Sequence, residues 1–142
     1  MTLPSHTKRT GLLEVRVRYT ECDPMGVAHH TAYPVWFEMG RTELLRDSGV
    51  SYRDLERQGV LIAVVKLSVQ YKRPARYDDL LVLETTISGS GRATIEHAYE
   101  LRLDGRLLTT ASTTVVCLDP DGHPRPLPDA LAPAEVNPHV RR

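Results

Sequence analysis

The second half of the sequence is a series of short strand-like segments separated by turn residues. Residues 60–73, 80–88, 92–103 and 106–119 are rich in β-branched and leucine side chains, with alternating polar positions. The Asp104-Gly105 pair lies between the last two segments and favours a tight hairpin turn. Because short turns join antiparallel neighbours, this half of the chain predicts a largely antiparallel sheet.

The first half supplies one more strand and the helices. Residues 13–18 alternate between apolar and charged side chains, which predicts a half-exposed strand. Residues 31–49 have helical periodicity, with Thr31 as the expected N-cap and Gly49 as the expected stop. A short second helix is expected over residues 51–59. The apolar face of the long helix consists of Tyr33, Trp36, Phe37, Gly40 and Leu44.

This order of elements predicts an α+β domain, with an antiparallel sheet of about five strands packed on one long helix. The 142 residues fit a single domain, residues 1–142, with its core at about residues 12–119. Six of the ten prolines lie in residues 120–142, and this segment is expected to be an extended or disordered tail.

Composition excludes several classes of protein. The hydrophobic fraction of 41% and the charged fraction of 25% are typical of a globular domain. A formal net charge of zero argues against a nucleic-acid partner. No apolar run approaches the roughly 20 residues that span a membrane, and the N-terminus has no signal-peptide core. With two cysteines expected to be reduced, Cys22 and Cys117, a cytoplasmic location is predicted.

Residues 18–30, with the sequence RYTECDPMGVAHH, gather reactive side chains on one short connection before the long helix. A metal site, a nucleophilic cysteine, a catalytic carboxylate and a polar turn are the four alternatives. The spacing lacks the H-x-x-x-H and C-x-x-C patterns typical of zinc sites, which disfavours a metal. Cys22 has no evident base with an orienting third residue, which disfavours a thiol nucleophile.

The longer motif RVRYTECDPMGVAHHTAYPVWFEMGRTELLR resembles the signature of the hotdog-fold acyl-CoA thioesterases, in the 4-hydroxybenzoyl-CoA thioesterase and YbgC-like branch. The later stretch VKLSVQYKRPARYDDLLVLET resembles the same family, so the resemblance covers residues 13–119. The matching positions of the first motif are Asp23, Gly26, Val27, His30, Tyr33, Glu38, Arg41, Glu43 and Leu45.

The resemblance implies a hotdog fold, a homodimer or homotetramer, and active sites at the dimer interface. It also implies that Asp23 is the catalytic carboxylate and that backbone amides near His30 polarise the thioester carbonyl, with a part for the His30 side chain. No metal or redox cofactor is implied. A thioester suits such a site because its leaving thiolate has a pKa of about 8.5 and needs little acid assistance. Asp23 would then act as general base or as nucleophile.

Four kinds of position are expected to bind the substrate, and some of them have an equally simple structural role. Gly26, Val27 and Tyr33 are expected at the substrate, although Tyr33 is equally a core residue. Three basic residues are expected to hold the phosphates of coenzyme A, or to form only a solvated turn: Lys72, Arg73 and Arg76.

Four further residues are expected to be structural. These are His29, His97, and a buried pair of Glu38 with Arg41. The alternative functions are an acyl-carrier-protein thioesterase and a non-catalytic acyl-CoA-binding module. The first would depend on the carrier protein, and the second would bind its ligand without turnover.

Overall fold

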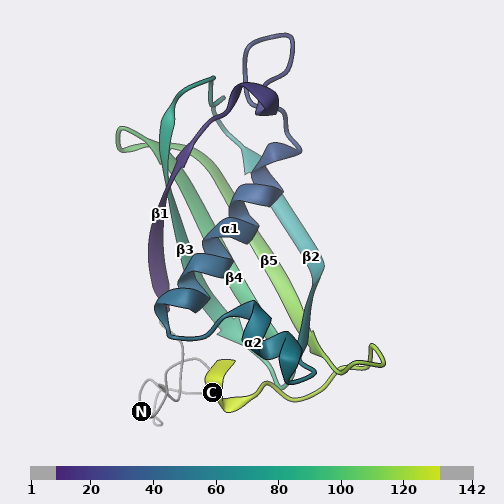
Figure 1. Ribbon diagram of the computed structural model, residues 1–142. Helices are drawn as coiled ribbons and strands as arrows, with labels where there is room; N and C mark the ends of the chain where they lie inside the picture. Colours follow the sequence, from purple (N-terminus) through teal and green to yellow (C-terminus); the bar gives the residue numbers. More distant parts are fainter. Residues whose placement is uncertain (1–8, 132–142) are drawn as a thin grey trace.

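The computed structural model describes residues 9–131 and contains five strands, two α-helices and two 3-10 helices over that range. In Figure 1 the long helix α1 lies across one face of the curved sheet. The elements in chain order are β1 (Thr10–Arg16), η1 (Tyr19–Glu21), α1 (Ala32–Asp47), α2 (Tyr52–Arg57), β2 (Leu61–Tyr71), β3 (Leu80–Ser90), β4 (Thr94–Leu103), β5 (Arg106–Leu118) and η2 (Asp129–Leu131).

The five strands form one sheet in the order β1-β3-β4-β5-β2, and every neighbouring pair is antiparallel. The β4–β5 hairpin turns at Asp104 and Gly105, whose φ angles of 51° and 82° are those of a type I′ turn. This sheet, covered by one long helix, confirms the predicted α+β architecture.

Helix α1 packs very closely on β3. Trp36 and Phe37 are each only 1% exposed and fill the space between the helix and the sheet. At Gly40 an added Cβ would lie 2.4 Å from Thr85 Oγ1, so only a glycine allows this approach. The helix begins after Thr31 as predicted, but the Thr31 side chain does not cap it and instead lies 2.8 Å from His29 Nδ1.

Within residues 9–131, strand β2 lies at an edge of the sheet and carries exposed apolar side chains. Its pairing with β5 skips Val65, which is 61% exposed, so the alternation expected from that residue is interrupted by a β-bulge. Val64, Leu67 and Tyr71 are between 43% and 48% exposed. A long edge with such side chains is a surface on which another strand can pair.

The first part of the proline-rich segment after β5 contacts the sheet. Pro124 forms a bridge with Leu118, and the Arg125 N–H donates to the Cys117 carbonyl over 3.0 Å. Leu131 is 3% exposed and belongs to a buried hydrophobic cluster that also contains Leu44, Leu55 and Val115. The rest of the expected tail, residues 132–142, lies outside the described residues.

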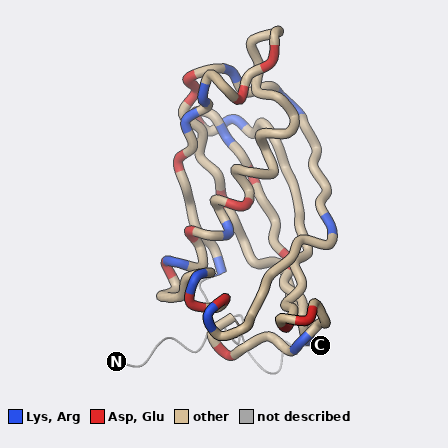
Figure 2. The backbone as a smooth tube through the Cα atoms, turned by 45° about the vertical axis from the view of Figure 1, so that its right-hand side comes forward, with Lys and Arg blue, Asp and Glu red and all other residues tan. Residues whose placement is uncertain are grey.

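Charged residues of both signs are spread over the described part of the chain. Figure 2 shows that acidic and basic residues are interspersed along the backbone. In the described part of the chain, neither α-helix has the length and apolar character that crossing a membrane requires.

Candidate active site

Asp23 forms its own closed turn between η1 and α1. Its Oδ1 accepts hydrogen bonds from the amides of Met25 (2.8 Å) and Val27 (3.4 Å). Its backbone N–H donates to the Val27 carbonyl over 2.9 Å, and Gly26 has a φ of +81° that favours glycine. The hydrogen bonds described for the carboxylate use Oδ1, which leaves Oδ2 to meet a water or a substrate.

The turn is tied to the segment that connects β2 and β3. Val27 forms an antiparallel bridge with Arg76, and the Ala28 N–H donates to the Ala75 carbonyl over 2.7 Å. Cys22 forms a second bridge with Ala28. The fold therefore brings Arg76 beside the Asp23 turn, although the two lie far apart in the sequence.

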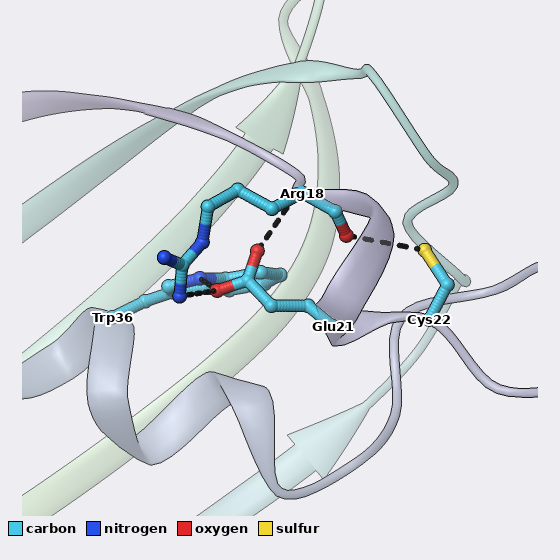
Figure 3. Close-up of polar contacts among 4 residues, drawn as sticks. All are labelled: Arg18, Glu21, Cys22 and Trp36. Atoms are coloured by element: carbon cyan, nitrogen blue, oxygen red, sulfur yellow. Dashed lines mark hydrogen bonds and ion pairs between the residues drawn. The ribbon is translucent and has the colours of Figure 1, made fainter.

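Glu21 fixes this connection to α1, as Figure 3 shows. Its Oε2 accepts from the Trp36 indole over 2.9 Å, and its Oε1 accepts from the Arg18 amide over 2.7 Å. Burial raises the pKa of Glu21, but these hydrogen bonds and the Arg18 guanidinium outweigh it, so the pKa lies below its ordinary value. The Cys22 thiol donates to the Arg18 carbonyl, a contact that fits a packing role. The sequence alone does not reveal this contact of Glu21, because its partner Trp36 meets it only in the folded chain.

The two histidines lie at the start of α1. Their rings are 4.2 Å apart, and both side chains are exposed. The Thr31 N–H donates to His29 Nδ1 over 3.2 Å, which supports the structural reading of His29. The Tyr71 hydroxyl donates to the His30 carbonyl over 2.8 Å. No acceptor within residues 9–131 is described for the His30 N–H, so this amide can meet an oxyanion.

Tyr33 faces the core of the chain. It is 2% exposed, and its ring lies 4.7 Å from that of Trp36 and 4.9 Å from that of Tyr71. Burial raises the pKa of the Tyr33 phenol. The buried ring of Tyr33 thus packs under the first turn of α1, against Trp36 and Tyr71. The expected contact of Tyr33 with the substrate stays a prediction.

The three predicted phosphate-binding residues share one exposed segment after β2. The amides of Lys72 and Arg73 both donate to the Leu108 carbonyl over 2.9 Å, and the Arg76 amide donates to Asp79 Oδ2 over 2.8 Å. Their backbones are held while their side chains remain exposed. They lie at the Asp23 end of the molecule, through the bridge of Arg76 to Val27.

A groove runs between α1 and the edge strand β2, with a volume of about 300 Å³. It begins at Pro34 in the first turn of α1 and ends near Arg41. A groove of this size can take an acyl group. Its walls are formed by Pro34, Val35, Phe37, Glu38, Arg41, Val64, Leu67 and Thr113.

Arg41 closes the far end of the groove and is 6% exposed. Its Nη1 donates to the Tyr99 hydroxyl over 3.0 Å, and that hydroxyl lies 2.6 Å from Thr113 Oγ1. The predicted buried pair of Glu38 with Arg41 is therefore wrong: Glu38 is exposed, and the phenol of Tyr99 on β4 takes its place. The helix turns Glu38 toward the open groove, whereas Arg41 reaches the sheet.

One group of possible metal ligands lies on a different loop, within the described chain. One ligand atom from each of Asp119, Asp121 and His123 lies within 4.8 Å of the others. Asp119 Oδ1 accepts from the amides of Asp121 (2.9 Å) and His123 (3.0 Å), so the carboxylate serves a turn.

The model of the thioesterase-like superfamily matches residues 17–140. The chain belongs to this superfamily. A putative acyl-CoA thioesterase of Bacillus subtilis, YneP, is 38% identical over 107 residues, which are 75% of this chain and 78% of that protein. The acyl-CoA thioester hydrolase YbgC of Escherichia coli O6:H1 is 36% identical over 119 residues, with 82% of this chain and 89% of that protein covered.

Solved structures of thioesterases are similar to this fold. A DHNA-CoA thioesterase from Staphylococcus aureus superimposes with a TM-score of 0.81 at 34% identity, covering 83% of this chain and 80% of that one. A probable thioesterase from Bartonella henselae superimposes with a TM-score of 0.80 at 30% identity, covering 84% and 99%. These matches confirm the predicted hotdog fold and the predicted family of thioester hydrolases.

Proposed function

We propose that this chain is an acyl-CoA thioesterase that hydrolyses its substrate to a carboxylic acid and free coenzyme A, with Asp23 as the reacting carboxylate. The observation that carries the proposal is the position of Asp23. Its Oδ1 is held by backbone amides in a closed turn, and its Oδ2 is left for the reaction, on the connection that leads into α1. The names of the two relatives support the substrate class.

The chemistry can proceed in two ways with this geometry. As a general base, Asp23 takes a proton from a water whose oxygen adds to the thioester carbon, and the C–S bond then breaks to release the thiolate. As a nucleophile, a carboxylate oxygen displaces the thiolate to give a mixed anhydride, which water then hydrolyses. In both cases the carbonyl oxygen becomes negative, and the His30 N–H at the positive end of α1 stabilises it.

The site is proposed to be completed by a second copy of the chain. Strand β2 pairs with β5 on one side, and its other side has no partner strand within residues 9–131. The groove beside it is lined by Val35 of α1 and by Val64 and Leu67 of β2. Pairing of two β2 edges would cover these exposed apolar side chains. This supports a homodimer, which can double to a tetramer, with the acyl groove at the interface between copies.

Hydrolysis of acyl groups on acyl carrier protein remains the nearest alternative, because the same carboxylate and groove serve either thioester. A binding module without catalysis is the other alternative. It would leave unexplained why Asp23, on the short connection that leads into α1, has one carboxylate oxygen bound by amides and the other without a described partner.

The test is thiol release from short, medium, long and aromatic acyl-CoAs by the wild type and by Asp23→Asn. Asparagine keeps the turn acceptor and the size but loses the charge, so turnover should fall at least about 100-fold. Asp119→Asn is the matched control, because Asp119 closes a similar turn on another loop. Equal turnover by wild type and Asp23→Asn would refute the role of Asp23. Binding of acyl-CoA by a folded wild type without any turnover would support the binding module.

A further inference from the structure

Two tyrosines near the Asp23 turn expose their rings to solvent. Tyr19 is 78% exposed and Tyr77 is 56% exposed, yet their rings are in contact, with centroids 5.7 Å apart. The ring planes are nearly perpendicular, at 87°. Aromatic side chains carry a large apolar surface, so an exposed pair that the described chain leaves uncovered marks a surface for a partner or ligand.

The pair lies at the same end of the molecule as Asp23. Tyr19 opens η1, and its carbonyl accepts from the Cys22 N–H over 3.1 Å, which places it one turn before Asp23. Tyr77 directly follows Arg76, the residue that bridges to Val27 in the Asp23 turn. Both rings therefore stand on the two segments that hold the reacting carboxylate in place.

The cations on the segment that leads to Tyr77 favour an anionic ligand with phosphate groups. Arg16 contacts Asp78 at 3.9 Å, and Arg18 contacts Glu21 at 3.2 Å, so these two cations are already compensated. By contrast, no salt bridge within residues 9–131 is described for the exposed side chains of Lys72, Arg73 and Arg76. These three cations lie on the segment that leads to Tyr77.

We propose that Tyr19 and Tyr77 bind the adenine ring of coenzyme A, an inference that rests on the proposed thioesterase function. Two perpendicular rings form a corner in which a flat base can stack on one ring and meet the other with its edge. The neighbouring cations then face the phosphates that adjoin the adenosine. Acyl carrier protein presents its thioester on a phosphopantetheine arm without adenine. The tyrosine pair thus selects coenzyme A as the carrier of the acyl group.

The first experiment compares two carriers of one acyl group, coenzyme A and pantetheine, which lacks the adenosine and its phosphates. The variants are Tyr19→Ala and Tyr77→Ala, with Tyr19→Phe and Tyr77→Phe as controls that keep the ring. Since stacking of a base on an aromatic ring is worth about 1–3 kcal/mol, we expect each alanine variant to raise KM for acyl-CoA about tenfold. The kcat on acyl-CoA, hydrolysis of acyl-pantetheine and both phenylalanine variants should stay as in the wild type. An equal loss on both carriers, or no loss on either, would overturn the proposal.

The second experiment is calorimetric titration with adenosine 3′,5′-bisphosphate, which needs no turnover. We expect the wild type and the phenylalanine variants to bind it and the alanine variants to bind it about tenfold more weakly. Binding can be measured even if the wild type hydrolyses no thioester. A failure of the adenine site is therefore distinguishable from a failure of the proposed thioesterase activity. If the alanine variants instead changed the oligomeric state in size-exclusion chromatography, the pair would be a contact between copies and the adenine site would be refuted.

Discussion

Gly40 sets the distance between α1 and the sheet, and Gly40→Ala tests how firmly that distance is held. The added Cβ would lie 2.4 Å from Thr85 Oγ1 and 2.8 Å from Leu83 Cδ2, both on β3. Thr85 and Leu83 are 1% and 0% exposed, so neither can move into solvent. The substitution therefore forces α1 away from β3 or disturbs two buried side chains.

Two opposing effects decide the magnitude. Alanine in place of glycine within a helix is worth about 1 kcal/mol in favour of folding. Overpacking of a tight core typically costs about 1–3 kcal/mol, and two contacts below 3.0 Å place this case at the upper end. We expect Gly40→Ala to lower the free energy of unfolding by about 1–2 kcal/mol.

Urea denaturation of wild type and variant, followed by circular dichroism, measures this difference from the midpoint and the slope. Thr85→Ala with Gly40→Ala is the informative double variant. It removes the nearest clashing atom, and the Thr85 hydroxyl has no described hydrogen-bond partner to lose. We expect it to recover part of the loss, as a coupling between the two sites. A Gly40→Ala variant more stable than the wild type would show that α1 moves freely and would refute this account.

Two further predictions concern His97 and Tyr71. Burial, with a contribution from the Arg41 charge, lowers the pKa of His97 from an ordinary 6.5 to about 4, so the unfolded chain binds the proton more readily than the folded one. Stability should then fall as the pH drops from about 6.5 toward 4, by about 2 kcal/mol between pH 7 and pH 4.5. His97→Gln should flatten that part of the profile in urea titrations, and an unchanged profile would exclude His97 as its source. Tyr71→Phe loses the hydrogen bond to the His30 carbonyl but keeps the ring beside Tyr33. Since such a bond contributes about 1 kcal/mol to stability, we expect the free energy of unfolding to fall by at most about 1 kcal/mol. We also expect kcat to fall by up to about fivefold, because the His30 amide is then held less firmly. An unchanged kcat would show that the bond does not position the amide.

The sequence predicts those parts of the fold that depend on neighbouring residues. Ser51 accepts from the Asp54 N–H at the start of α2, and Gly49 and Gly59 have the positive φ expected where helices end. The Asp104-Gly105 turn forms the expected hairpin. In each case the backbone preference and the hydrogen bond lie within a few residues, so the pattern alone is sufficient.

The parts that the sequence does not predict depend on distant partners. Arg41 donates a hydrogen bond to the Tyr99 hydroxyl on β4 and forms no pair with Glu38. Helical spacing shows only neighbours on the same helix, so it cannot predict a partner on the sheet. The bulge at Val65 arises from pairing with β5 and cannot be read from β2 alone. Thr31 fails as a side-chain cap because His29 competes for its hydroxyl. The burial of Leu131 likewise depends on a cluster formed by earlier elements, which the proline-rich composition of residues 120–142 does not reveal.

One chain alone positions the proposed catalytic groups, whereas the acyl groove would be completed by the proposed partner chain. The Asp23 turn is closed by its own amides, and Glu21 joins the connection to Trp36 of α1. The carboxylate and the helix start are thus positioned within a single chain. The groove is different, because one wall is the open β2 edge with Val64 and Leu67. On the proposed dimer, changes at the β2 edge would alter which acyl groups are accepted, whereas changes at Asp23 would abolish turnover for all of them.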